Sequence, residues 1–237
     1  MSRIIAVMNS AGGVGRTTSA LSLSVAFSEY GKKVLMVDCD PQGALTFTFG
    51  KENSHRNVYD IYSGRARALG MLQQTSERVD LIASSPKLYA VGGSERVKKS
   101  EILFDALNKF EYDIIVVDSA SGLSELNRTV LAAADEIIIP TRLDLLSVRG
   151  ALHIAKASEQ YRGKVRAVLP TMVDPRSKHG NEMLAELTAK FGKILIQPGI
   201  PKSPLFLDAV VAGQSLLSYK KASEVAARYR EITYDLL

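Results

Sequence analysis

A glycine-rich segment near the N-terminus, residues 9–18 (NSAGGVGRTT), has the residue types needed to bind a phosphate group. It follows an apolar, β-branched stretch (3–8) and precedes a stretch with apolar residues at helical spacing (18–30), so we expect a turn between a strand and a helix. Glycines without Cβ let backbone N–H groups converge on an anion, and a helix N-terminus adds favourable dipole charge. The segment therefore predicts a phosphate site, with the Thr17 hydroxyl placed to reach magnesium.

Two further apolar stretches predict strands that end in carboxylates. Asp38 and Asp40 follow residues 34–37 (VLMV), and Asp118 ends residues 112–118 (YDIIVVD). In α/β sheets, ligands bind beyond the carboxyl ends of the strands, so we expect all three carboxylates to converge on the glycine-rich segment. Asp118 is then placed to hold magnesium through water.

Taken together, these motifs resemble the ParA/MinD group of P-loop ATPases. Their usual loop reads K-G-G-x-G-K-T-T, and this chain matches it apart from Ala11 at the first lysine and Arg16 at the second. Residues 38–43 (DCDPQG) are similar to the group's D-x-D-P-Q-G switch, in which the second aspartate, here Asp40, orients the attacking water and helps hold the metal's water shell. After Asp118 the group usually continues T-P-P, whereas residues 119–121 here are SAS.

The resemblance implies ATP and Mg²⁺ as cofactors and assigns roles to individual residues. Asp40 and Arg16 are expected to be catalytic, and the metal is expected near Thr17, Asp38, Asp40 and Asp118. The expected nucleotide contacts in the loop are Ala11, Gly12, Gly13, Val14, Gly15, Arg16, Thr17 and Thr18.

Two later segments extend the resemblance. Residues 169–174 (LPTMVD) are close to the group's L-x-T-M-Y-D, and residues 199–201 (GIP) resemble the segment that flanks adenine. By this analogy Met172 and Pro201 are adenine-pocket residues, although core packing is an equally good interpretation of Met172.

Composition and pattern agree with one domain over residues 1–237. The chain is 46% hydrophobic and 23% charged, and strands alternate with helical stretches, which predicts an α/β P-loop NTPase with a doubly wound, mostly parallel sheet. No apolar run approaches the roughly 20 residues of a membrane span, and the first strand starts at once, so we expect a cytoplasmic protein without a signal peptide.

Basic residues make DNA a candidate partner. The chain has 30 Lys and Arg against 25 Asp and Glu, a net charge of +5. Short ParA proteins bind nonspecific DNA through basic residues on the C-terminal side of the ATP-bound dimer, and a solvated basic face is the alternative interpretation. The DNA candidates are Lys202, Lys220, Lys221 and Arg228.

The resemblance to short, Soj-like ParA proteins without an N-terminal helix-turn-helix implies a nucleoid-associated, ATP-dependent homodimer that partitions or positions plasmid, chromosome or other large cargo with a ParB-like or other adaptor. Ala11 favours an alternative, a nucleotide-gated binding module or polymer with very slow or no hydrolysis. A MinD-like membrane-cycling ATPase would need a basic amphipathic tail, whereas residues 222–237 predict a single domain helix.

The missing lysine at Ala11 raises a further question. In relatives this lysine reaches the partner's phosphates across the dimer, and alanine cannot do so. Arg142 and Arg149 follow the strand that ends near residue 140 and are therefore candidates for a relocated cation.

Overall fold

The computed structural model describes residues 2–65, 70–91 and 94–237, and in this part of the chain seven strands form one sheet. The strand order is β3-β4-β2-β5-β1-β6-β7. The strands are β1 (Arg3–Val7), β2 (Val34–Asp38), β3 (Leu72–Gln74), β4 (Asp80–Ile82), β5 (Ile114–Asp118), β6 (Glu136–Arg142) and β7 (Lys164–Thr171).

The register of the central strands brings the functional segments to one edge of the sheet. All pairs are parallel except β3 with β4, and β5 lies between β1 and β2 with Asp118 opposite both Val7 and Asp38. Because parallel strands end at the same edge, the loop after β1 and the segments after β2 and β5 meet there.

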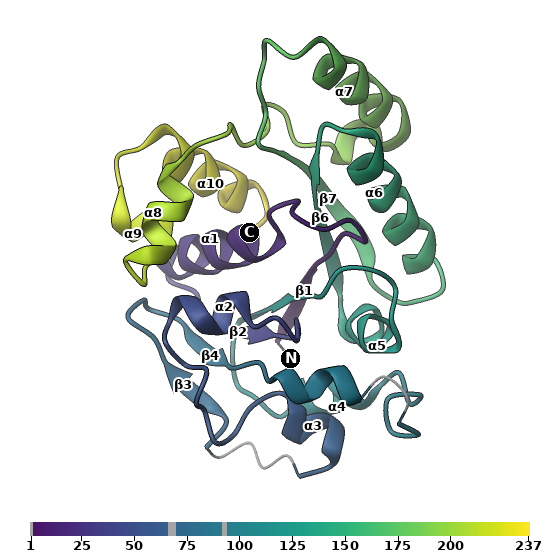
Figure 1. Cartoon of the computed structure of the whole chain (residues 1–237), viewed down its shortest axis with the longest axis vertical. Coiled ribbons are helices and arrows are strands. Elements are labelled where there is room, and N and C mark those ends of the chain that lie inside the picture. Colours follow the sequence, from purple (N-terminus) through teal and green to yellow (C-terminus); the bar gives the residue numbers. More distant parts are fainter. Residues whose placement is uncertain (1, 66–69, 92–93) are drawn as a thin grey trace.

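Helices cover both faces of the sheet (Figure 1). The sheet therefore separates two hydrophobic cores. Successive side chains of β1 point to opposite faces, so Ile4 and Ala6 pack in one core and Ile5 and Val7 in the other. The core that contains Ile5 is formed with α1 (Arg16–Glu29), α2 (Ala44–Thr48), α8 (Leu205–Val211), α9 (Leu216–Tyr219) and α10 (Glu224–Asp235). The opposite core is formed with α3 (Tyr59–Ser63), α4 (Ile102–Leu107), α5 (Glu125–Ala133), α6 (Leu145–Ser158) and α7 (Lys178–Phe191).

The predicted fold class is confirmed, and so is the helix expected near the C-terminal end, which is α10. Residues 51–100 contain two short strands, β3 and β4, and β3 adds an antiparallel strand at the sheet edge. Arg67 and the glycines at 92 and 93 in this region lie outside the described residues. In the part of the chain that the structure describes, no helix is both long and apolar enough to cross a membrane.

Candidate nucleotide site

The loop between β1 and α1 presents a row of backbone N–H groups to open space. Among the described residues, none accepts a hydrogen bond from the backbone N–H groups of residues 12–17. Gly13 (φ 67°) and Gly15 (φ 84°) adopt the left-handed conformation that favours glycine, and a Cβ on Gly12 or Gly13 would meet no atom within 4 Å. The N–H groups therefore line open space at the start of α1, which is the geometry of an anion site.

Neighbouring segments hold this loop in place. The Thr171 hydroxyl donates to the Val14 carbonyl (2.9 Å), the Asn9 amide donates to the Pro140 carbonyl (2.8 Å), and the Gly122 N–H donates to the Ser10 carbonyl (3.0 Å). The loop is thus tied to the segment that follows β5, to β6 and to the last residue of β7. We did not predict a role for Asn9 or Thr171, although Thr171 lies within the motif that drew attention to Met172.

Arg16, the first residue of α1, turns its guanidinium back into the loop. Its Nη1 donates to the carbonyls of Asn9 (3.0 Å) and Ala11 (2.5 Å), and its Nε donates to the carbonyl of Ser119 (3.0 Å). Its Nη2 lies 4.0 Å from Oδ2 of Asp40, and only 10% of the side chain is exposed. Arg16 therefore places a fixed positive charge among the loop and the segments that follow β2 and β5.

Asp118 is a fully buried carboxylate without a hydrogen-bond partner among the described residues. Burial raises its pKa well above the usual value and the nearby charge of Asp38 acts in the same direction, whereas the neighbouring Thr17 hydroxyl and Arg16 guanidinium oppose this. An uncompensated buried carboxylate is costly, so a cation fits this position. Mg²⁺ suits it because Mg²⁺ is usually bound by one or two carboxylates together with phosphates and water.

A denser cage of protein ligands is not present, since the described residues contain no group of three or more His, Cys, Asp or Glu side chains that could hold a metal. A metal at Asp118 would therefore need ligands from a bound phosphate and from water. This agrees with a magnesium ion that arrives with a nucleotide.

The two aspartates after β2 have different environments. Oδ2 of Asp38 accepts hydrogen bonds from the Thr46 N–H (2.8 Å) and hydroxyl (2.7 Å), and Oδ1 accepts the Asp40 N–H (3.1 Å). Burial raises the pKa of Asp38 to about 6, an effect that these hydrogen bonds oppose. Asp40 instead accepts the Gln42 N–H at Oδ1 (2.9 Å) and turns Oδ2 toward Arg16. Asp38 thus holds the switch segment, and we leave it out of the proposed metal site, whereas Asp40 faces the loop.

An apolar pocket of about 270 Å³ adjoins the start of α1. Met172, which is 45% exposed and has a φ of 52°, lines it, while Pro201 does not, although its neighbours Ile200 and Lys202 do. A mostly apolar pocket with a few polar groups suits a nucleobase. The full lining is Gly15, Thr18, Thr171, Met172, Ile200, Lys202, Ser203, Phe206, Leu207 and Tyr229.

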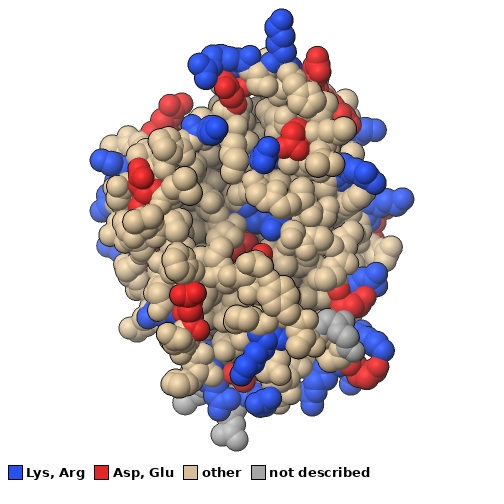
Figure 2. Space-filling view, viewed as in Figure 1, with Lys and Arg blue, Asp and Glu red and all other residues tan. Residues whose placement is uncertain are grey.

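The four DNA candidates do not share one environment. Lys220 and Lys221 are exposed after α9, Lys202 lines the apolar pocket, and Arg228 is largely covered, with 16% of its side chain exposed. The Arg228 guanidinium donates to the Pro198 carbonyl and pairs with Glu231. Figure 2 shows Lys and Arg mostly around the rim of the face in view, interspersed with acidic residues. Lys220 and Lys221 are therefore the better placed candidates.

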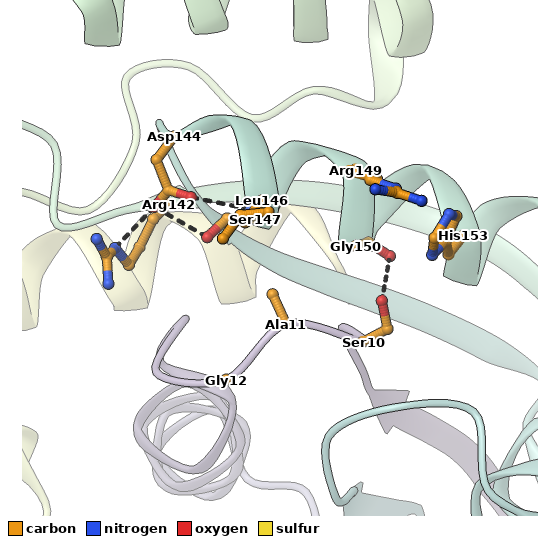
Figure 3. A pocket seen from close by; sticks show the side chains of 10 residues that line it. All are labelled: Ser10, Ala11, Gly12, Arg142, Asp144, Leu146, Ser147, Arg149, Gly150 and His153. Carbon is orange, nitrogen blue, oxygen red and sulfur yellow. Dashed lines mark hydrogen bonds and ion pairs between the residues drawn. The ribbon is translucent and has the colours of Figure 1, made fainter.

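Ala11 lines a hollow beside the glycine-rich loop that Arg142 and Arg149 also line (Figure 3). The structure therefore brings both arginines near the position that lacks lysine.

A doubly wound sheet with a glycine-rich loop between its first central strand and a helix defines a P-loop NTPase. A protein-family model described as "AAA domain" matches residues 2–170. The chromosome-partitioning ATPase Soj of Thermus thermophilus is 29% identical over 242 residues, covering 99% of this chain and 95% of that protein. The chain therefore belongs to this AAA-domain family, within the ParA/MinD group of P-loop ATPases.

Two solved structures are similar over the whole chain. Cobyrinic acid a,c-diamide synthase from Mycobacterium smegmatis, with bound ADP and magnesium, has a TM-score of 0.83 and 27% identity, covering 100% of this chain and 94% of that one. An ATP complex of a McdA variant from Cyanothece has a TM-score of 0.88 and 22% identity, and the match covers 99% of this chain and 96% of that one. The second likeness shows the fold alone.

Proposed function

We propose that this chain is a ParA-type switch that binds ATP with magnesium, dimerises, and binds nonspecific DNA in the dimeric state. The observation that carries this proposal is the row of N–H groups at residues 12–17 beside the buried carboxylate of Asp118, all of them without hydrogen-bond partners among the residues that the structure describes. One group of atoms suits an anion and the other a cation, as a magnesium nucleotide requires.

The remaining parts of the site fit the same ligand. Arg16 can exchange its carbonyl acceptors for phosphate oxygens, which guanidinium binds in a fork. Thr17 and Asp118 would hold magnesium, and the pocket at Met172 would receive the base. Asp40 would orient the water that attacks the terminal phosphate, since its Oδ2 lies beside the Arg16 guanidinium at 4.0 Å, which is an ion pair at the limit of its range and not a hydrogen bond.

The names of two relatives support a proposal for the cellular role. Soj of Thermus thermophilus is a chromosome-partitioning ATPase, and Caulobacter vibrioides ParA is a chromosome partitioning protein. We propose the same kind of task here, on the nucleoid, with a ParB-like or other adaptor that links the dimer to plasmid, chromosome or other large cargo. Lys220 and Lys221 would contact DNA phosphates, so binding would be independent of sequence and sensitive to salt.

The test is the mass of the protein by size-exclusion chromatography with light scattering, with ATP, ADP or no nucleotide, followed by binding to an arbitrary DNA duplex. A dimer and DNA binding in ATP alone would support the switch. A monomer in all three states, or DNA binding that ignores the nucleotide, would contradict it.

A second candidate is a nucleotide-gated binding module or polymer that hydrolyses ATP very slowly or not at all. Ala11 favours it, because loss of a cation that acts across a dimer can lower the rate by about 10³-fold or more. The test is ATP turnover with DNA present. Undetectable wild-type turnover that Ala11→Lys restores would favour the slow module, and ordinary wild-type turnover would exclude it.

A further inference from the structure

The hollow beside Ala11 has a volume of about 400 Å³ and opens at the molecular surface. Figure 3 shows Ala11 below the start of α6, with Arg142 on one side and Arg149 and His153 on the other. The methyl group of Ala11 leaves this space free, so the loop itself brings no charge to it. The hollow is lined by Ser10, Ala11, Gly12, Arg142, Asp144, Leu146, Ser147, Arg149, Gly150 and His153.

The start of α6 is fixed against the loop. A Cβ on Gly150 would lie 2.8 Å from the Ala11 nitrogen and 3.1 Å from the Ala11 Cβ, so only glycine allows this close approach. Ser10 Oγ donates to the Gly150 carbonyl (3.3 Å), and Asn9 donates to the Ser147 carbonyl (3.3 Å). These contacts fix the backbone of α6 next to the loop, and Arg149 is one residue before Gly150.

The two arginines differ in their partners. Nε of Arg142 lies 3.0 Å from Oδ2 of Asp144, which also caps α6 by accepting the Ser147 N–H (2.9 Å) and hydroxyl (3.0 Å). Arg149 is exposed and forms no ion pair or hydrogen bond within the described part of the chain. The hollow thus has a surplus positive charge, and Arg149 is the side chain that can offer it to a ligand.

The surface around the hollow is suited to contact. Leu145 and Leu146, at the start of α6, are 62% and 71% exposed. Exposed leucines next to the loop and next to Arg149, which has no partner in the described part of the chain, favour an occupant with an apolar rim and a negatively charged centre. A second copy of the chain meets both conditions, because it offers the same leucines and the phosphates of its own nucleotide, and symmetric self-contact is the commonest arrangement of dimers.

We propose that this surface receives a second copy of the chain, and that Arg149 binds the phosphates held in the partner's loop, supplying the positive charge that Ala11 lacks. The inference rests on the proposed function, because it requires an ATP-bound dimer. Arg149, on the neighbouring helix α6, then takes the role that a lysine within the loop has in relatives. Arg142 stays paired with Asp144.

The first experiment compares dimer formation by analytical ultracentrifugation with a slowly hydrolysed ATP analogue and Mg²⁺. Arg149→Ala should weaken dimerisation at least about tenfold, since a charge-assisted contact is lost, while monomer affinity for the analogue stays within about twofold. Arg149→Lys should recover part of the loss. Lys156→Ala is the matched control, because Lys156 is exposed two turns further along α6 and does not line the hollow.

The outcomes separate the inference from the proposed function. If the wild type stays monomeric with the analogue, the proposed function and the inference about Arg149 are both contradicted. If the wild type dimerises and Arg149→Ala dimerises equally well, the inference alone is overturned. Arg149→Ala combined with Ala11→Lys should dimerise better than Arg149→Ala, because the lysine returns a cation to the same hollow.

The second experiment tests whether Arg149 acts across the interface. Arg149→Ala chains labelled with a donor dye are mixed with Arg16→Ala chains labelled with an acceptor, and energy transfer reports hybrid dimers. Each hybrid contains one complete site, formed by an intact loop from the first chain and an intact Arg149 from the second. Hybrids should therefore form more readily than either variant pairs with itself. Hybrids no more stable than the self-pairs would show that Arg149 does not act on the partner's nucleotide.

Discussion

The two sides of the phosphate loop differ sharply in how they are packed. On the inner side Arg16 is nearly buried and donates to three backbone carbonyls, and Asp40 and Asp118 lie close by. On the outer side Ala11 faces an open hollow in which Arg149 has no partner within the described residues. Both sides depart from the usual motif of the group, Arg16 by exchanging one cation for another and Ala11 by losing a charge.

The different packing of the two sides shows how the protein accommodates Arg16 and Ala11 in place of the two usual lysines. The larger guanidinium at residue 16 fits because nearby carbonyls accept its extra N–H groups, so the charge stays inside the loop. Within the described part of the loop no charged group takes the place of the lysine that is missing at residue 11, but Arg149 on α6 lines the same hollow. We therefore expect changes on the inner side to affect nucleotide binding and turnover in each chain, and changes on the outer side to affect dimers.

The largest effect is expected for Asp40→Ala, on the inner side. Turnover should fall about 100-fold, because a group that positions or activates water contributes on that order, while ATP affinity changes less than about threefold. A coupled phosphate-release assay and equilibrium ATP binding measure the two quantities. Asp105→Ala, at an exposed position on α4, is the control. Loss of ATP binding by a folded Asp40→Ala variant would contradict the assigned role.

Asp118→Asn should remove the magnesium dependence of nucleotide binding. We expect affinity in Mg²⁺ to fall about thirtyfold, since contacts with a charged partner are each worth about 1.5–3 kcal/mol. The same variant should be more stable than the wild type without Mg²⁺, by about 1 kcal/mol, because a buried unpaired charge is removed. Thermal unfolding with and without Mg²⁺ tests this. A less stable metal-free variant that keeps its magnesium response would refute it.

These two aspartates also show what sequence can and cannot predict. The apolar strands, the glycines at the turn and the carboxylates at strand ends have strong patterns, so the sheet and the meeting of Asp38, Asp40 and Asp118 at one edge were predictable. The sequence does not predict which of these carboxylates lacks hydrogen-bond partners. That depends on Thr46, a residue on α2 whose hydroxyl donates to Asp38.

Other features left no signal in the sequence. β3 is three residues long and polar (LQQ), which is too short for an alternation pattern to register. Phe206 and Tyr229 line the pocket with Met172, but they are apolar residues far along the chain, and periodicity does not distinguish a residue that lines a pocket from one in the core. The sequence predicts Arg16 as a phosphate ligand, whereas its three carbonyl acceptors depend on the folded backbone of the loop and of the segment after β5.

A substitution remote from both sides of the loop should leave nucleotide affinity unchanged. Replacing Lys220 and Lys221 by Glu should weaken ATP-dependent DNA binding about tenfold or more and make it less sensitive to salt, because phosphate contacts are lost. The matched control replaces Lys190 and Lys193, also exposed, by Glu. Fluorescence anisotropy with a duplex at several salt concentrations gives both quantities. Equal DNA affinity in the Lys220 and Lys221 variant would place the DNA surface elsewhere.

The smallest effect is expected in the apolar pocket. Met172→Ala should weaken ATP affinity about fivefold, because the buried apolar contact with the base becomes smaller. Triphosphate without a base should bind both proteins equally, which separates a role in the pocket from damage to the loop. Equal ATP affinity in the variant would show that Met172 only packs against the surrounding chain.

The most direct test of the central claim, that Arg16 is the phosphate-binding cation of the inner side, is the affinity for ATP with Mg²⁺ of the wild type, Arg16→Lys and Arg16→Ala by isothermal titration calorimetry. Arg16→Ala should bind at least about tenfold more weakly, and Arg16→Lys should lie between it and the wild type because it keeps the charge but loses the fork. Unchanged ATP affinity in a folded Arg16→Ala variant would contradict the account.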